Sequence, residues 1–147
     1  MDTKFHQILL AEDDMDDRYV LHQAFDELGY LDHVKFLHSG DELLKHLRYY
    51  RDAAFTPSLI VLDYNMPIIN GGEVLIHIKR DESLKNIPVV LYSTGMKPIL
   101  KHQLLALGAF ECYEKGFNYS NFFDLAKVFK KIAEEGIPVE SDEIVSE

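Results

Sequence analysis

Leu59-Ile60-Val61-Leu62-Asp63 is the stretch of sequence that decides the fold, and Tyr64-Asn65-Met66-Pro67 follows it directly. Four consecutive apolar residues, bounded by turn-forming residues, predict a strand that is buried on both faces, as in a parallel sheet covered by helices. An aspartate at the carboxyl end of such a strand lies at the edge where open α/β sheets bind their ligands. We therefore expect Asp63 to be a rigidly held, functional carboxylate.

Short apolar runs of the same kind recur along the chain and alternate with longer segments of helical periodicity. The predicted strands are residues 8–11, 34–37, 59–62, 89–92 and 111–113. The helical segments between and after them have their apolar residues within 19–28, 43–47, 74–78, 99–107 and 122–132. This alternation is typical of successive βα units around one parallel sheet, so the sequence predicts the α/β class.

The composition limits the possible functions. The chain has 147 residues, 47% of them apolar, which matches one ordinary globular domain. We expect this domain to span residues 1–136 and to be followed by an acidic, disordered tail at 137–147. The net charge of −10 comes without any cluster of lysines and arginines, which argues against a nucleic-acid partner.

The expected location is the cytoplasm. Cys112 is the single cysteine, which excludes an internal disulfide framework and a cysteine-based zinc site, and it suits a reducing compartment. No apolar segment approaches membrane-spanning length, so we expect no membrane association.

Acidic residues also follow the first predicted strand. Glu12 and Asp13 end that strand and are expected to meet Asp63, because parallel strands end at the same edge. Carboxylates that are forced together repel one another unless a cation neutralises them, and oxygen ligands with open positions suit Mg²⁺. We interpret Asp16 and Asp17 differently, as acids that favour the dipole of the first turn of a helix.

A hydroxyl and an ammonium group are expected at the same edge. Ser93 follows the fourth predicted strand and Lys115 follows the fifth. A carboxylate that accepts a phosphoryl group needs a metal and a cation to offset the charge on the phosphoryl oxygens, and a hydroxyl to orient one of them. Each residue alone is a weak signal, because such lysines are usually solvated and such serines usually cap helices. Their order at successive strand ends is specific.

The chain resembles the receiver domain of two-component response regulators. The resemblance covers about residues 7–135, and its matching segments are residues 8–14, 62–72, 87–94 and 107–109, with Lys115. It implies a flavodoxin-like, doubly wound sheet of five parallel strands in the order 2-1-3-4-5, with helices on both faces.

The resemblance also implies roles for individual residues. Asp63 would be the phosphoacceptor, Ser93 and Lys115 would bind phosphoryl oxygens, and Mg²⁺ would be held by Glu12, Asp13, Asp63 and the backbone carbonyl of Asn65. The phosphoryl group would come from a sensor histidine kinase or a phosphotransfer protein. We expect a stand-alone receiver that signals to an unknown downstream protein and catalyses nothing beyond its own phosphorylation and dephosphorylation.

The sequence departs from the family pattern around two of these residues. Gly116 follows Lys115 where the family usually has proline, so we predict a trans peptide bond there, because a cis bond without proline costs about 3 kcal/mol. The bulk of Thr94, after the serine, is expected to restrict the approach to the phosphoacceptor. We also expect Gly71 to adopt a positive φ in the turn after Asn70.

A further departure concerns the aromatic residue that changes rotamer on activation in this family. Its position is occupied by Cys112, which we interpret as a small buried hydrophobe and not as a redox sensor. Tyr92, Cys112 or Tyr113 is expected to replace the aromatic switch. The activation-dependent surface is predicted to run from the fourth helix through the fifth.

Three other functions compete with this one. The chain could be a degenerate receiver that acts only as a protein-binding module. A phosphatase of the haloacid dehalogenase type also uses an aspartyl nucleophile, but it has a second aspartate two residues later, where this chain has Asn65. A flavodoxin-like cofactor carrier would need a phosphate-binding loop after the first strand, where acids stand instead.

Overall fold

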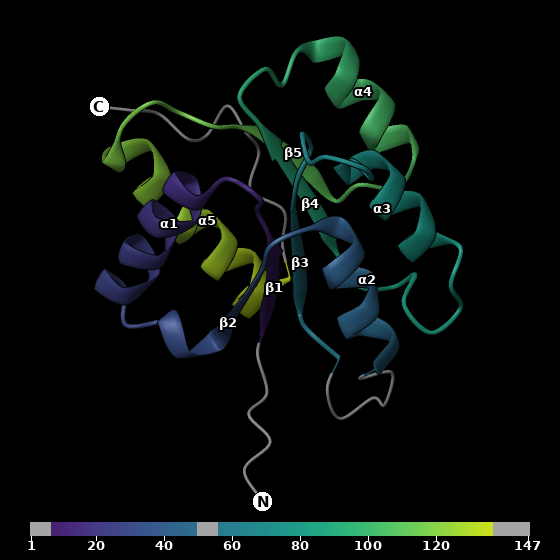
Figure 1. Ribbon diagram of the computed structural model, residues 1–147, viewed down its shortest axis with the longest axis horizontal. Helices are drawn as coiled ribbons and strands as arrows, with labels where there is room; N and C mark the ends of the chain where they lie inside the picture. The colour runs from purple at the N-terminus through teal and green to yellow at the C-terminus, as the bar shows by residue number, and fades with distance from the viewer. Residues whose placement is uncertain (1–6, 50–55, 137–147) are drawn as a thin grey trace, which may run out of the picture.

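Five parallel strands form one sheet in the order β2-β1-β3-β4-β5, which confirms the predicted fold class and strand order (Figure 1). The structure, a computed structural model, describes residues 7–49 and 56–136. Within these residues the strands are β1 Ile8–Ala11, β2 Val34–Leu37, β3 Leu59–Asp63, β4 Val89–Ser93 and β5 Glu111–Glu114. The predicted tail at 137–147 lies outside the described residues.

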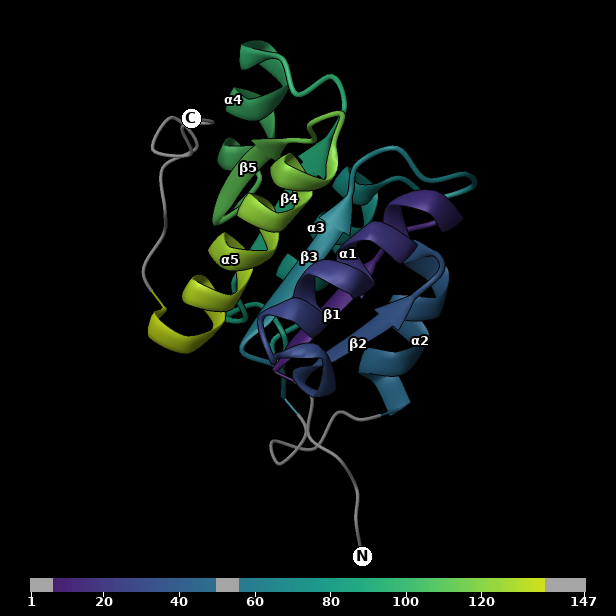
Figure 2. The ribbon, with the colours of Figure 1, turned by 90° about the vertical axis from the view of Figure 1, so that its left-hand side faces the viewer.

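The helices are α1 Met15–Glu27, α2 Gly40–Tyr49, α3 Gly71–Lys79, α4 Pro98–Ala106 and α5 Tyr119–Glu135, with a short 3-10 helix at Leu31–His33. Helices α1 and α5 cover one face of the sheet, and α2, α3 and α4 cover the other (Figure 2). Every residue of the central strands β1 and β3 is buried, because helices pack on both faces. No helix in the described part is long and apolar enough to span a membrane.

Three strands extend one residue further than the sequence predicted. Strand β3 includes Asp63, β4 includes Ser93 and β5 includes Glu114. Backbone hydrogen bonds continue the sheet to the next residues, since Tyr64 N–H donates to Tyr92 O at 2.9 Å and Lys115 N–H donates to Ser93 O at 2.9 Å. The residues at the carboxyl ends of the strands are therefore held by the sheet itself.

The prediction of a positive φ at Gly71 is wrong. Gly71 is the first residue of α3, which begins with a capping box between Asn70 and Glu73. Glycine is needed there because of close packing: a Cβ atom would stand 2.7 Å from the carbonyl oxygen of Asp63 and 2.9 Å from Cα of Tyr64. The helix thus begins in contact with the end of β3.

The positive φ in this loop belongs instead to Ile68. Its φ is 71°, and Ile69 N–H donates to Pro67 O at 2.8 Å, so Ile68 is the central residue of a γ-turn. Its side chain is fully exposed. A β-branched residue rarely adopts this conformation, so the loop that follows Asp63 holds local backbone strain.

The loop after β5 has the predicted trans peptide bond between Lys115 and Gly116. A Cβ atom at residue 116 would lie 2.0 Å from Cβ of Asn121, which is too close for any other residue without a shift of the chain. Asn121 takes part in the capping box at the start of α5, where its side chain accepts from Phe117 N–H at 3.0 Å. Glycine therefore lets α5 begin directly beside the end of β5.

Candidate functional site

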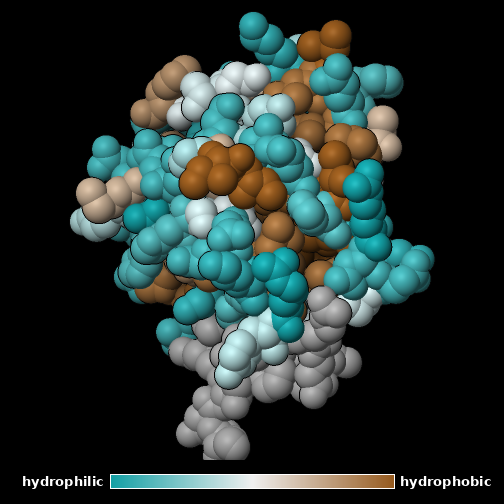
Figure 3. Space-filling model, turned by 45° about the vertical axis from the view of Figure 1, so that its right-hand side comes forward, coloured by the Kyte–Doolittle hydropathy of each residue, from teal (hydrophilic) through white to brown (hydrophobic). Residues whose placement is uncertain are grey.

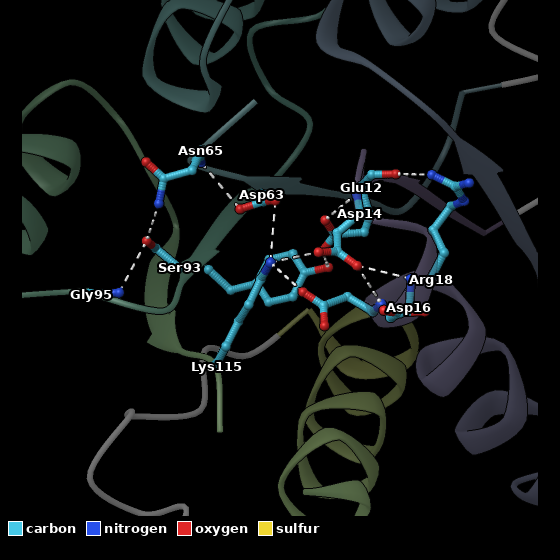
Figure 4. A network of polar contacts seen from close by, with 11 residues as sticks. Glu12, Asp14, Asp16, Arg18, Asp63, Asn65, Ser93, Gly95 and Lys115 are labelled. Carbon is cyan, nitrogen blue, oxygen red and sulfur yellow. Dashed lines mark hydrogen bonds and ion pairs between the residues drawn. The ribbon is translucent and has the colours of Figure 1, made fainter. Parts of the chain in front are cut away.

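Four polar residues that end different strands lie together in the buried part of the carboxyl edge of the sheet (Figure 4). Glu12 follows β1, Asp63 ends β3, Ser93 ends β4 and Lys115 follows β5. All four side chains are buried, although this edge of an α/β sheet is normally open to ligands. Buried polar groups require partners: Lys115 pairs with Glu12 and Asp63, and the Ser93 hydroxyl accepts from Asn65.

The Lys115 ammonium contacts three carboxylates. Its Nζ lies 2.9 Å from Oδ2 of Asp17, 3.0 Å from Oε1 of Glu12 and 3.2 Å from Oδ2 of Asp63. The same Nζ lies 4.8 Å from the centre of the Tyr92 ring, a cation–π distance. One ammonium is thus shared among three acids, which leaves excess negative charge in the pocket.

Burial and crowding shift the acid–base equilibria of these groups. Burial raises the pKa of Asp63, and the neighbouring Glu12 carboxyl raises it further, against the opposing effect of Lys115. Burial alone would lower the pKa of Lys115, but Glu12, Asp17 and Asp63 raise it above its ordinary value. The ammonium therefore stays charged, while the carboxylate of Asp63 needs further positive charge to ionise readily.

A cation fits this arrangement. Glu12, Asp13 and Asp63 each offer a carboxylate oxygen, and these atoms lie within 4.8 Å of one another. Asp13 is exposed whereas the other two are buried, so the group opens toward solvent on one side. Oxygen donors with room for water suit Mg²⁺, and the excess of acids over ammonium groups favours a divalent cation.

Asn65 and Ser93 form the other side of the pocket. The backbone N–H of Asn65 donates to Oδ1 of Asp63 at 3.1 Å, and its side-chain Nδ2 donates to Oγ of Ser93 at 3.0 Å. Gly95 N–H also donates to Oγ of Ser93, at 3.3 Å. Both bonds use the hydroxyl oxygen as acceptor, which leaves its proton for another acceptor. Thr94, which lies between Ser93 and Gly95 in the sequence, is exposed.

The structure adds three residues to the pocket that sequence reasoning did not assign to it. Asp17 was interpreted as a surface acid of α1, yet its carboxylate contacts Lys115. The Tyr92 hydroxyl donates to Oε1 of Glu12, and Arg18 Nη1 donates to the carbonyl oxygen of Glu12 at 2.7 Å. Local sequence contains no separate signal for Asp17, because an acid in the first turn of α1 is already explained by the helix dipole. Asp16 is exposed, as expected.

The residues expected to replace the aromatic switch lie on opposite faces of the sheet. Cys112 is fully buried among the side chains on the α2–α4 face, which confirms its interpretation as a small hydrophobe, and burial raises the pKa of its thiol to about 12. Tyr92 and Tyr113 lie on the other face, with ring centres 5.9 Å and 6.0 Å from that of Phe129. Which of them acts as a switch stays a prediction.

Comparison with known proteins gives matches along most of the chain. The family described as response regulator receiver domain matches residues 8–127. The phosphorylated cyanobacterial phytochrome response regulator RcpA superimposes with a TM-score of 0.76 at 32% identity, covering 90% of this chain and 96% of that chain. The manganese-bound form of response regulator Rcp1 has a TM-score of 0.70 at 26% identity, with the same two coverages of 90% and 96%.

Curated relatives are matched over shorter regions. The probable methanogenesis regulatory protein FilR2 of Methanothrix harundinacea is 36% identical over 89 residues, which is 60% of this chain and 57% of that protein. The two-component response regulator ORR4 of Oryza sativa is 30% identical over 129 residues, covering 78% of this chain and 54% of that protein. The chain thus spans little more than half the length of these relatives.

Proposed function

Because the chain belongs to the family of response regulator receiver domains, we propose that Asp63 accepts a phosphoryl group from a sensor histidine kinase or a phosphotransfer protein. One observation carries the proposal: the Lys115 ammonium lies 3.2 Å from Oδ2 of Asp63 in a buried pocket that also contains the carboxylate group suited to Mg²⁺. One relative of known structure is phosphorylated and another holds Mn²⁺, which supports the same chemistry here.

The transfer is a displacement at phosphorus. A carboxylate oxygen of Asp63 forms the new P–O bond, the P–N bond of the donor phosphohistidine breaks, and its electron pair returns to the imidazole. Glu12, Asp13, Asp63 and the Asn65 carbonyl would hold Mg²⁺, which when bound supplies positive charge against the repulsion between carboxylate and phosphoryl group. Lys115 would pair with one phosphoryl oxygen.

Ser93 would orient a second phosphoryl oxygen through its hydroxyl proton. Asn65 is bonded to both residues: its Nδ2 donates to Ser93 Oγ at 3.0 Å, and its backbone N–H donates to Oδ1 of Asp63 at 3.1 Å. This preorganisation supports transfer because the donor groups need no rearrangement when charge develops. The chain would then act as a phosphoacceptor with no external substrate to turn over, in a cytoplasmic signalling pathway.

The acyl phosphate would act by shifting the population of conformations at α4, β5 and α5 toward one that binds a downstream protein. Helix α4 supports this assignment, because Leu104 is its buried residue while Ile99 and Leu105 face solvent. The surface that includes this helix shows apolar patches among hydrophilic side chains (Figure 3). Exposed apolar groups of this kind often mark protein contacts.

Intact-mass measurement after incubation with acetyl phosphate tests the proposal. We expect wild type to gain one phosphoryl mass with Mg²⁺ and none in excess chelator, whereas Asp63→Asn should gain none under either condition. Asp16→Asn, which removes an exposed acid of α1, should label like wild type. Equal labelling of wild type and Asp63→Asn would overturn the proposed chemistry. No labelling of wild type would favour a degenerate receiver that acts only by binding.

A further inference from the structure

We propose that Asp17 is a positioning residue that holds the Lys115 ammonium before phosphorylation and releases it when phosphoryl oxygens arrive, so that the first turn of α1 responds to the state of Asp63. The inference rests on the proposed function and adds a regulatory contact to it. Its starting point is the distance of 2.9 Å between Lys115 Nζ and Asp17 Oδ2, which is shorter than the distances from Nζ to Glu12 and Asp63.

Asp17 differs from the other two acids around Lys115. Glu12 and Asp63 belong to the carboxylate group that suits a divalent cation, and Asp17 does not. When a cation and a phosphoryl group occupy the pocket, the charges of Glu12 and Asp63 are engaged with them. Asp17 then competes directly with the phosphoryl oxygens for the ammonium. A phosphoryl group carries more negative charge than one carboxylate, so the competition favours the phosphoryl oxygens.

The position of Asp17 allows this exchange. Its side chain is 26% exposed, whereas that of Lys115 is 7% exposed, so the carboxylate has water as an alternative partner and the ammonium does not. Release of Asp17 therefore leaves a carboxylate that solvent can stabilise, with no unpaired buried charge. Burial of the lysine stem keeps the ammonium inside the pocket, within reach of a phosphoryl group on Asp63.

The contact links two parts of the chain that are 98 residues apart, the first turn of α1 and the end of β5. Three further bonds hold that turn: the Asp14 side chain accepts from the backbone N–H groups of Asp16 and Asp17, and Arg18 donates to the Glu12 carbonyl. These three bonds are local to the β1–α1 connection, while the Asp17–Lys115 pair joins this turn to the opposite side of the pocket. Its loss would loosen the turn without unfolding α1.

Beryllofluoride with Mg²⁺, a phosphoryl analogue, provides the test. Titrations followed by amide NMR give the beryllofluoride concentration at half saturation. Asp17→Asn keeps the shape of the side chain but removes the charge, and it should lower this concentration about 3- to 10-fold, in line with the loss of one competing charge-assisted hydrogen bond. Asp17→Glu should restore a value near wild type. Asp16→Asn also removes one negative charge from this turn, but Asp16 is not the residue that contacts Lys115. Its half-saturation concentration should therefore match that of wild type.

Hydrogen exchange of residues 15–18 provides the second readout. In wild type, beryllofluoride should speed exchange in this turn, because the pair with Lys115 is broken. In Asp17→Asn the exchange should already be fast and should not change on addition of the analogue. A general loss of helix stability would not produce this dependence on the analogue.

The outcomes separate the two proposals. Failure of wild type to bind beryllofluoride would overturn the proposed function. Normal binding by wild type, together with the same half-saturation concentration for Asp17→Asn and Asp16→Asn, would overturn the role of Asp17 alone. Weaker binding by Asp17→Asn would also overturn it, since Asp17 would then assist the phosphoryl group instead of competing with it.

Discussion

Replacement of Gly71 by alanine should destabilise the domain through one added methyl group. The new Cβ would stand 2.7 Å from the Asp63 carbonyl oxygen, 2.9 Å from Cα of Tyr64 and 3.0 Å from Cδ2 of Leu91. Two of these atoms belong to the backbone at the end of β3 and cannot rotate away. The helix α3 or the end of the strand must therefore move by several tenths of an ångström.

The size of the effect follows from three contributions. Overpacking a well-filled region destabilises by about 1–3 kcal/mol. Movement of the helix also weakens the hydrogen bond from Gly71 N–H to Tyr64 O, now 2.9 Å long, which contributes about 1 kcal/mol. Alanine forms helices more readily than glycine, and this difference stabilises the variant by up to about 1 kcal/mol. The expected net loss is about 2 kcal/mol, or a fall in Tm of roughly 4–8 °C for a domain of this size.

Urea unfolding of wild type, Gly71→Ala and Gly72→Ala measures this loss with a matched control. A Cβ on the adjacent Gly72 would meet Asn70, Leu104 and Tyr64 side-chain atoms at 3.3–3.4 Å, which adjust more easily than backbone. Gly72→Ala should therefore stay within about 1 kcal/mol of wild type. Equal stability of the two variants would refute the close-packing argument for Gly71.

Three further predictions concern the pocket and the core. Folding favours the protonated form of Asp63, because burial and Glu12 raise its pKa; its ionisation therefore opposes folding increasingly as pH rises from about 4 toward neutrality. In chelator, urea unfolding should show that Asp63→Asn gains stability relative to wild type as pH rises over that range. A difference in unfolding free energy between the two proteins that stays constant with pH would contradict this prediction. Tyr92→Phe removes a buried donor to Glu12 and should lower the unfolding free energy by about 1–3 kcal/mol. Tyr119→Phe, which loses an exposed bond to Glu27, should lose less. A thiol reagent should label Cys112 only after unfolding, because the thiol is buried and its pKa is raised; rapid stoichiometric labelling of the folded protein would show otherwise.

The strands and the members of the pocket that end them were predictable because each signal is local. Ile8–Ala11 and Leu59–Asp63 are buried on both faces, so their apolar runs are continuous, and each run ends where polar residues begin. Parallel strands share one carboxyl edge, so placing Ser93 and Lys115 at strand ends was enough to bring them near Asp63. Strands β1 and β2 have the predicted bounds, and only the last residue of β3, β4 and β5 was missed, because polar side chains mark the edge before the hydrogen bonding ends.

The remaining features depend on tertiary contacts that no local pattern contains. An acid in the first turn of a helix has a sufficient local explanation, so the pairing of Asp17 with Lys115 needs the packing of α1 beside the end of β5. Asn70-Gly71 is a turn signal by composition, and the nearby Asp63 carbonyl, not φ, explains the glycine. The positive φ of Ile68 could not be predicted, because the intrinsic preference of a β-branched residue is for negative φ.

The extension of sheet hydrogen bonds past the strand ends has a kinetic consequence. Glu12 N–H donates to Leu37 O at 3.0 Å, and the N–H groups of Tyr64 and Lys115 are bonded in the same way to neighbouring strands. The Tyr64 amide pairs the interior strands β3 and β4, so it can exchange with solvent only when these strands separate, which is close to global unfolding. Strands β2 and β5 are the edges of the sheet, so exchange of the Glu12 and Lys115 amides needs only the opening of an edge strand. The Lys115 side of the pocket can therefore open and close many times in the life of a folded molecule, while Asp63 keeps its position until the whole domain unfolds.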